Sequence, residues 1–294
     1  MTRRPWILIV LILLVLFGIL IITAGGILYA LFGDSEESFM GKNIAVIDVQ
    51  DVILESRPFI QRLQKLTDEG HIKGIVIRVD SPGGVVGPCQ EMYDAVLKAR
   101  EKKPIVISMG AVAASGGYYI AAAGQKIVAN PGTLTGSIGV RMDFANLERL
   151  YQWAKIDPVS LKSGQFKDIG TSTRAMTPEE RNLLQGILDD LHKQFVDAIT
   201  KNRKLDKKVV PTLTDGRIFS GKQAKEKGLV DELGGLEVAI DEVAKLAKVK
   251  EPKVLYPPEP KPKIIELLTQ LSRSVEGLTN IRGSYLSPLF IMRP

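Results

Sequence analysis

After residue 42 the chain alternates between short apolar runs and amphipathic stretches. The apolar runs have the length and β-branched content of buried strands and lie at 43–49, 74–80, 104–110, 126–130 and 156–161. Between them, residues 58–69 and 88–102 place apolar side chains at helical spacing, and a turn is expected at SPGG. This alternation predicts an α/β domain with a mainly parallel sheet.

The second half of the domain is predicted to be richer in helix. A Gly-broken helix is expected from about Ser115, a turn at PGTLTGS and a further helix around 145–154. The stretch 177–204 opens with Thr177, and Glu180 follows three residues later, which is the pattern of a capping box. We expect this long amphipathic helix to cover the sheet or to join a partner.

The N-terminal segment differs from the rest of the chain. Residues 6–32 contain no charged residue and exceed the roughly 20 residues that a helix needs to cross a bilayer, so a transmembrane helix is predicted there. A cleaved secretory signal is the alternative, but its apolar core is usually shorter. Arg3 and Arg4 precede the segment and acidic residues follow it, which predicts residues 1–5 in the cytoplasm and the domain outside.

The remaining boundaries follow from composition. Residues 33–42 are polar and are interpreted as a tether, and residues 43–250 form the globular domain. Five prolines between Pro252 and Pro262 indicate an extended linker, followed by a predicted amphipathic helix at 263–278. The segment 251–294 is therefore expected to be a linker and a peripheral arm.

Charge and cysteine content exclude several classes of protein. The formal net charge is +6, and no basic stripe interleaved with aromatic residues indicates nucleic-acid binding. The single cysteine, Cys89, rules out an internal disulfide, and the chain has no zinc-binding motif. His71 and His192 are the two histidines, and both are expected at the surface or in helix packing, so a Ser-His-Asp site is disfavoured.

Two Gly-rich loops follow predicted strands, where parallel sheets place their sites. In DSPGG (80–84), the glycines allow backbone amides to turn towards a ligand, as an oxyanion hole requires, although a plain tight turn explains them too. In GAVAASGG (110–117), Ser115 stands before two glycines and a helix, so it is either a nucleophile or an N-cap.

A serine without a histidine needs another base, and lysine serves when burial favours its neutral form. Lys167 is the candidate because it lies in a Gly- and Ser-bearing loop, KSGQFKDIG. Spacing alone does not separate it from Lys162 or from an exposed loop lysine. Ser81, Ser137 and Cys89 are minor alternatives for the nucleophile.

The segments DSPGG, AASGGYYIA, TGSIGV, KSGQFKDIG and GRIFSGKQAKEKGLVDELGG, in this order, resemble the signal peptide peptidase A family in a short, single-domain form. The resemblance covers residues 43–248. It implies an α/β fold of the Clp/crotonase type, in which ββα units wind into a superhelix behind one N-terminal transmembrane helix. It also implies a membrane-bound serine endopeptidase of the bacterial inner membrane, with the domain on the extracytoplasmic side.

The resemblance assigns roles to individual residues. Ser115 is the nucleophile and Lys167 the general base, acting within the chain or on a neighbouring subunit. The amides of Gly83 or Gly84 and of Gly116 are expected to bind the oxyanion. The resemblance further implies no cofactor or metal and a homo-oligomeric ring or dome.

The implied substrates are signal peptides left in the membrane and other hydrophobic peptides. Val85 and Ser137 are expected to line the groove that holds them. Three alternatives remain open: a related Ser-Lys protease that acts on a stomatin-like partner, a crotonase-class enzyme that acts on a coenzyme A thioester, and a non-catalytic membrane scaffold.

Overall fold

The structure, a computed structural model, describes most of the globular domain and small parts of the two ends. The described residues are Leu14, 16–18, Leu20, Thr23, 41–203, 205, 209–256 and 289–291. The chain divides into two compact units, one of Met1–Ser38 with Pro258–Gly283 and one of Phe39–Pro257 with Ser284–Pro294. The architecture given below is that of the second unit.

The predicted transmembrane helix at 6–32 lies largely outside the described residues, and the predicted helix at 263–278 lies wholly outside them. Within the part of the chain that is described, no helix is both long enough and apolar enough to cross a bilayer. The membrane anchor and the C-terminal helix therefore stay predictions.

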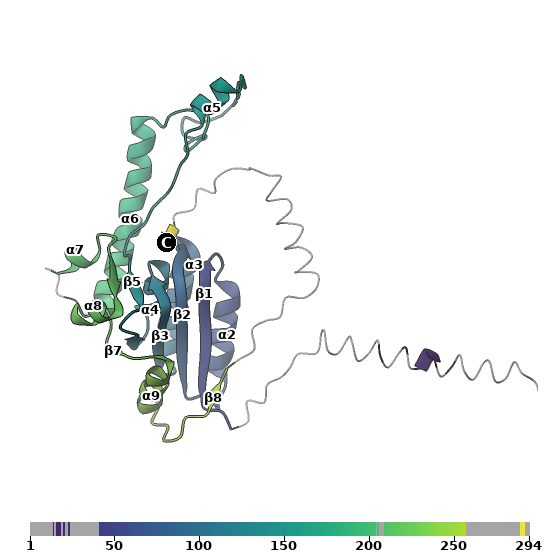
Figure 1. Ribbon diagram of the computed structural model, residues 1–294, viewed down its shortest axis with the longest axis vertical. Helices are drawn as coiled ribbons and strands as arrows, with labels where there is room; N and C mark the ends of the chain where they lie inside the picture. Colours follow the sequence, from purple (N-terminus) through teal and green to yellow (C-terminus); the bar gives the residue numbers. More distant parts are fainter. Residues whose placement is uncertain are drawn as a thin grey trace, which may run out of the picture. The chain divides into compact units, whose positions relative to one another are not determined.

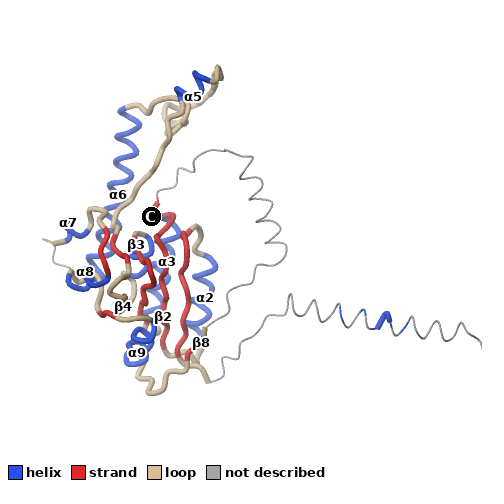
Figure 2. Tube along the Cα trace, in the orientation of Figure 1, coloured by secondary structure: helices blue, strands red, loops and turns tan. Residues whose placement is uncertain are grey.

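A mixed sheet forms the centre of the unit and comprises nine strands among the described residues (Figures 1 and 2). The strand order is β6-β5-β3-β2-β1-β8, with β4 beside β3 and β7, and β9 beside β2. The strands are β1 (Ile44–Ile53), β2 (Gly74–Val85), β3 (Ile105–Ala114), β4 (Lys126–Ala129), β5 (Leu134–Gly136), β6 (Ile218–Ser220), β7 (Glu232–Leu233), β8 (Val254–Leu255) and β9 (Leu289–Ile291). Among the strand pairs of the described residues, only β5–β6 and β2–β9 are antiparallel, which confirms the prediction of a mainly parallel sheet.

Helices cover both faces of the sheet, which explains why its central strands are apolar throughout. The helices are α2 (Arg57–Asp68), α3 (Val86–Arg100), α4 (Gly116–Ala121), α5 (Glu148–Trp153), α6 (Pro178–Arg203), α7 (Val210–Leu213), α8 (Gly221–Glu226) and α9 (Leu236–Leu246). One face carries Ile47, Ile77 and Ile107, which share a buried cluster with side chains of α2, α3 and α4. The opposite face carries Val46 and Val76, which share a second cluster with α9.

Three sequence predictions were wrong in detail. SPGG is not a turn, because β2 continues through it to Val85 and pairs there with β1 and β9, while Gly83 takes a φ of 103° that other residues rarely adopt. In PGTLTGS the turn is confined to Pro131 and Gly132, and Leu134–Gly136 form the short strand β5, which pairs with β3 and β6. Residues 156–161 form no strand, and Leu161 is 95% exposed, so this apolar run has no sheet or helix to cover it.

The segment from 141 to the middle of α6 extends beyond the sheet as an arm that carries α5 at its far end (Figure 1). The capping box predicted at its return is confirmed. The amide of Glu180 donates to Thr177 Oγ1 at 3.2 Å, and the amide of Thr177 donates to Glu180 Oε2 at 2.9 Å. These two bonds fix the point within the arm at which α6 begins.

Candidate active site

Ser115 lies in the link between β3 and α4, and the helix begins at the next residue. Its backbone has φ 53° and ψ −117°, a conformation that residues other than glycine rarely adopt. The amide of Ser115 donates to the carbonyl of Gly136 at 2.8 Å, and its carbonyl accepts from the amide of Tyr119 at 2.8 Å. The surrounding structure therefore holds a strained serine in place, as is often found at catalytic sites.

The packing around Ser115 requires small neighbours. Ser115 is only 1% exposed, and Gly116 and Gly117 are buried beside it. A Cβ atom at Gly117 would lie 2.8 Å from the carbonyl oxygen of Ser81, so α4 packs directly on the backbone of β2. The amide of Gly116 belongs to the first turn of α4, whose amides have no carbonyl partner within the helix.

The segment Ser81–Gly84 borders Ser115 from the neighbouring strand, since Ser81 pairs with Ala113. The Ser81 hydroxyl is fully buried, donates to the carbonyl of Asp51 and accepts from the amide of Gly83 at 3.1 Å. The Gly83 amide is thereby engaged within the protein. Gly84 packs so tightly that a Cβ atom there would lie 2.0 Å from the carbonyl oxygen of Ile53.

The end of β2 has strands on both sides. On one side, Val52 and Ile53 of β1 pair with Gly83 and Gly84. On the other side, β9 runs antiparallel to β2, with Ile291 opposite Gly83 and Leu289 opposite Val85. Because β9 also contacts α3 and α4, it lies on the side of β2 that faces the helix following Ser115 (Figure 1). This edge of the sheet thus accepts an extended peptide segment next to the serine.

The two groove residues predicted from the sequence lie at the same edge of the sheet. Ser137 follows Gly136, the residue whose carbonyl accepts the amide of Ser115, and it is half-buried with φ 50°. Its own amide donates to the carbonyl of Arg217 at 2.8 Å. Val85 ends β2 opposite Leu289. The structure therefore places Ser115, the DSPGG segment, Val85 and Ser137 at the same end of neighbouring strands.

Lys167 is not brought to Ser115 within one chain. It lies in the arm with an exposed side chain, and no hydrogen bond or ion pair between described residues involves its ammonium group. Lys162, the alternative, donates to the carbonyl of Gln165 at 3.1 Å and forms an ion pair with Asp168 at 2.5 Å. The two lysines that spacing alone did not separate thus have different environments, and only Lys162 is held by neighbours.

A charged cluster flanks Lys167 in the arm. Asp168 binds Lys162 and lies 3.0 Å from Arg174, which in turn forms a two-pronged ion pair with Glu180 at 2.5 and 2.9 Å. The hydrogen bond from Lys162, and then that from Arg174, lowers the pKa of Asp168. The Arg174 guanidinium, aided by the Thr177 amide, lowers the pKa of Glu180 to about 2. Both carboxylates are therefore ionised at neutral pH, and through Arg174 their ion pairs tie the loop that carries Lys167 to the start of α6.

The other residues considered from the sequence are engaged in hydrogen bonds or in core packing. His71 is exposed and bonds to Glu69 at 3.0 Å, while His192 bonds to the carbonyl of Thr214 at 2.7 Å. Cys89 is buried in the core, and this burial raises its pKa to about 12, which disfavours a reactive thiolate. Ser81, a minor candidate for the nucleophile, uses its hydroxyl for the two bonds that hold DSPGG.

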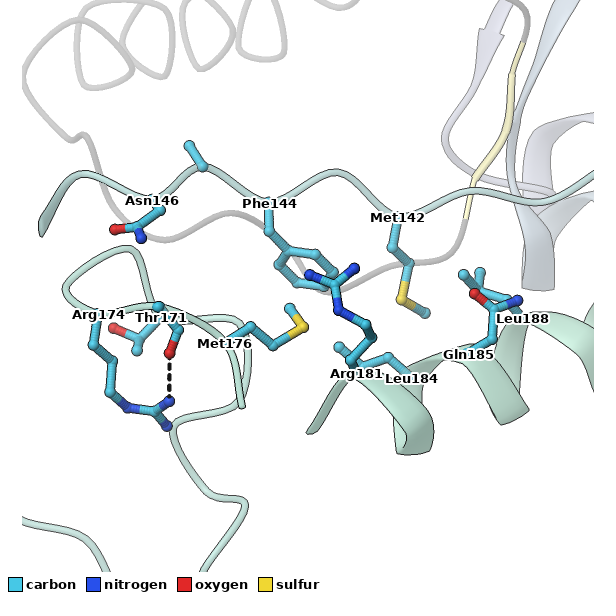
Figure 3. Close-up of a pocket in the computed structure, with 12 residues that line it drawn as sticks. Met142, Phe144, Asn146, Thr171, Arg174, Met176, Arg181, Leu184, Gln185 and Leu188 are labelled. Carbon is cyan, nitrogen blue, oxygen red and sulfur yellow. Dashed lines mark hydrogen bonds between the residues drawn. The ribbon is translucent and has the colours of Figure 1, made fainter. Parts of the chain in front are cut away.

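A cavity of about 420 Å³ lies at the root of the arm, and Arg174 of the charged cluster is among the residues that line it. Met142 and Phe144 line it from the extended segment after β5, and Arg181 and Leu184 line it from α6 (Figure 3). Neither this cavity nor the strand β9 is predicted from the sequence. The walls of the cavity come from two segments some forty residues apart, which no local pattern connects. The only sequence signal for β9 is the three-residue apolar run LFI.

Comparison with known proteins places the chain among peptidases. Residues 98–250 match the family described as "Peptidase family S49". A putative protease of Synechocystis is 42% identical over 214 residues, which cover 72% of this chain and 77% of that protein. A putative signal peptide peptidase of Enterococcus faecium is 32% identical over 75% of this chain and 68% of its own length.

A more distant relative agrees with this placement. The chloroplastic serine protease SPPA of Arabidopsis thaliana is 30% identical over 79% of this chain but only 35% of its own length. With a family match over residues 98–250 and these relatives, the chain belongs to peptidase family S49 and is a serine-type protease related to signal peptide peptidase A.

Proposed function

We propose that this protein is a membrane-anchored endopeptidase that cleaves hydrophobic peptides, including signal peptides left in the membrane, with Ser115 and Lys167 as its catalytic pair. The observation that carries the proposal is the pairing of β9 with Gly83–Val85 beside a strained, buried serine. A site that accepts one extended segment as an antiparallel strand suits an extended peptide substrate. The name of the Enterococcus relative supports signal peptides as the substrate class.

The proposed chemistry is acyl transfer to Ser115. Lys167, as a neutral amine, removes the proton of the Ser115 hydroxyl while Oγ forms a bond to the scissile carbonyl carbon. The amides of Gly84 and Gly116 stabilise the resulting oxyanion, and the Gly83 amide is left to Ser81, to which it already donates. The carbon–nitrogen bond then breaks, the lysine returns its proton to the leaving amine, and water hydrolyses the acyl-enzyme.

Lys167 is proposed to act on the Ser115 of another copy of the chain. A lysine is an effective base only where burial favours its neutral form, and Lys167 is exposed in the single chain. The arm that carries it also exposes Trp153 at 81% and Leu161 at 95%. Apolar side chains at such exposure suit a surface that another subunit covers. A homo-oligomer would bury this surface and Lys167 in one step.

The wider organisation belongs to the same proposal. The mixed α/β sheet is consistent with repeated ββα units of the Clp/crotonase type, and the apolar segment 6–32 is proposed to anchor the domain outside the cytoplasm in the bacterial inner membrane. Anchoring would keep the site near peptides that remain in the bilayer.

The test is hydrolysis of a fluorogenic hydrophobic peptide by the full-length chain in detergent. Ser115→Ala and Lys167→Ala should each abolish activity, while the matched control Lys162→Ala should keep most of it. Mixing the two inactive variants under conditions that allow subunit exchange should restore part of the activity, because some sites then combine an intact serine with an intact lysine. Full activity of Ser115→Ala would refute the nucleophile. A mixture that stays inactive although exchange is demonstrated would refute the action of Lys167 across subunits.

A further inference from the structure

Asp80, the first residue of the DSPGG segment, lies where the pairing of β2 and β3 is interrupted. Val79 pairs with Met109, but the next paired residues are Ser81 and Ala113. One residue of β2 therefore stands opposite three residues of β3, Gly110 to Val112. Such a bulge redirects the strand that contains it, and bulges are frequent next to active sites.

The carboxylate of Asp80 fills this bulge. Its Oδ2 accepts from the amide of Ala111 at 3.3 Å and its Oδ1 accepts from the amide of Val112 at 3.1 Å. A Cβ atom at position 110 would lie 2.4 Å from Asp80 Oδ2, so Gly110 leaves the space that the carboxylate occupies. Asp80 thus supplies two acceptors to amides that β2 does not pair.

Two hydroxyls hold the same bulge from the opposite side. Thr133 Oγ1 donates to the carbonyl of Gly110 at 2.7 Å, and Thr135 Oγ1 donates to the carbonyl of Ala113 at 2.6 Å. Ser115 follows Ala113 by two residues, and the strain in its backbone must be supported by the chain that leads into it. The direction of residues 113–115 therefore depends on the bulge and on the carboxylate inside it.

The residue after Asp80 holds the other half of the site. Ser81 fixes the amide of Gly83 and the carbonyl of Asp51. Asp80 and Ser81 together thereby link the strand that leads to the serine with the segment proposed to stabilise the oxyanion. A small displacement of either part changes the distance that the nucleophile must cover to the carbonyl carbon.

We propose that Asp80 is a positioning residue for catalysis, whose carboxylate sets the approach of Ser115 relative to the DSPGG segment without itself transferring a proton. This inference rests on the proposed peptidase function. It assigns Asp80 a role through Ser115, so its loss should slow acylation and leave peptide binding largely unchanged.

The test compares Asp80→Asn and Asp80→Ala with the wild type in the full-length protein. An asparagine keeps one acceptor oxygen but turns an NH₂ group towards the second amide, and an alanine removes both acceptors. Val76→Ala is the matched control, because it removes buried atoms from the cluster that β2 shares with α9, away from the bulge, and lowers stability without touching the Asp80 carboxylate. Steady-state hydrolysis and the pre-steady-state acylation rate with an activated ester are measured on the folded fraction of each protein.

We expect kcat and the acylation rate to fall by about 10- to 100-fold in Asp80→Asn and further in Asp80→Ala, with KM within about twofold of wild type. The pH profile of kcat/KM should keep its shape, and Val76→Ala should keep the wild-type kcat. Wild-type kcat in both Asp80 variants would overturn the positioning role while the peptidase function stands. The positioning role would also be overturned if the activity of the Asp80 variants fell only in proportion to their folded fraction, as is expected of Val76→Ala. An inactive wild type, by contrast, would overturn the proposed function itself and this inference with it.

Discussion

The amide of Ser115 donates a 2.8 Å hydrogen bond to the carbonyl of Gly136, so the candidate nucleophile is held by the end of a neighbouring strand. Gly136 has φ +80°, and a Cβ atom there would lie 2.7 Å from the ring of Phe219. The position therefore requires glycine for two reasons, a left-handed backbone and a lack of space. The geometry of Ser115 depends on a residue 21 positions away in the sequence.

Gly136→Ala should therefore impair both stability and activity. We expect a loss of about 1–3 kcal/mol in the free energy of unfolding, measured with urea, because the backbone strain and the contact with Phe219 act together. Peptidase activity of the folded fraction should also fall. Gly132→Ala is the control, since nothing lies within 4 Å of a Cβ atom there and its φ is not left-handed. Equal stability of the two variants would contradict the role given to Gly136.

Removal of β9 should increase activity at low substrate concentration. The strand occupies the edge at Gly83–Val85 where a peptide substrate is proposed to bind, so it competes with substrate. A chain that ends at Pro288 should show an apparent KM about fivefold lower at unchanged kcat, which corresponds to about 1 kcal/mol of competing interaction. A chain that ends at Ile291 keeps the strand and is the control. An unchanged KM in the shorter chain would show that β9 does not compete with peptides.

Acid should weaken the root of the arm through Glu180. Its pKa is about 2 in the folded chain because Arg174 hydrogen-bonds its carboxylate, whereas a glutamate in an unfolded chain titrates at about 4.3. Since the folded-state pKa is the lower one, the stabilisation is present above about pH 4.3 and is lost as the pH falls towards 2.

The corresponding measurement is the urea midpoint of the wild type and of Glu180→Gln at neutral pH and at about pH 3. The wild type should be the more stable of the two at neutral pH, and the difference should shrink at the acidic pH. Glu179→Gln, an exposed neighbour on the same turn, should show no such difference. A difference that stays constant with pH would mean that the charge of Glu180 does not support the fold.

Assembly should depend on the apolar side chains of the arm. Trp153→Ser and Leu161→Ser change residues that are 81% and 95% exposed, so each should leave the melting temperature of the dissociated chain nearly unchanged. Both should shift the sedimentation profile towards smaller species and lower the activity, because Lys167 shares this arm. Leu246→Ser, at a position that is 41% exposed on α9, is the control and should keep the wild-type assembly.

Much of the fold could be predicted from the sequence by itself. The apolar runs of β1 to β4 and the capping box at Thr177 and Glu180 are local patterns, and local patterns decide secondary structure where burial and hydrogen bonding agree with them. Periodicity failed at 156–161, where apolar residues lie exposed in the arm, since a strand needs a partner that the sequence pattern does not reveal. The prediction of a turn at SPGG was wrong for the opposite reason, because the segment has strand partners in β1 and β9 that keep it in the sheet.

From the sequence alone, the family relationship could be predicted, and the comparisons bear it out; the same sequence indicated the candidate residues, a serine before two glycines and a lysine in a small-residue loop. Their arrangement came from the tertiary structure. It brought Gly136, Ser81 and the C-terminal strand to Ser115, engaged Lys162 with Asp168, and left Lys167 exposed in the arm. The physical reason is that hydrogen bonds and burial between residues far apart in the chain depend on the pairing order of the strands, which a local pattern does not contain.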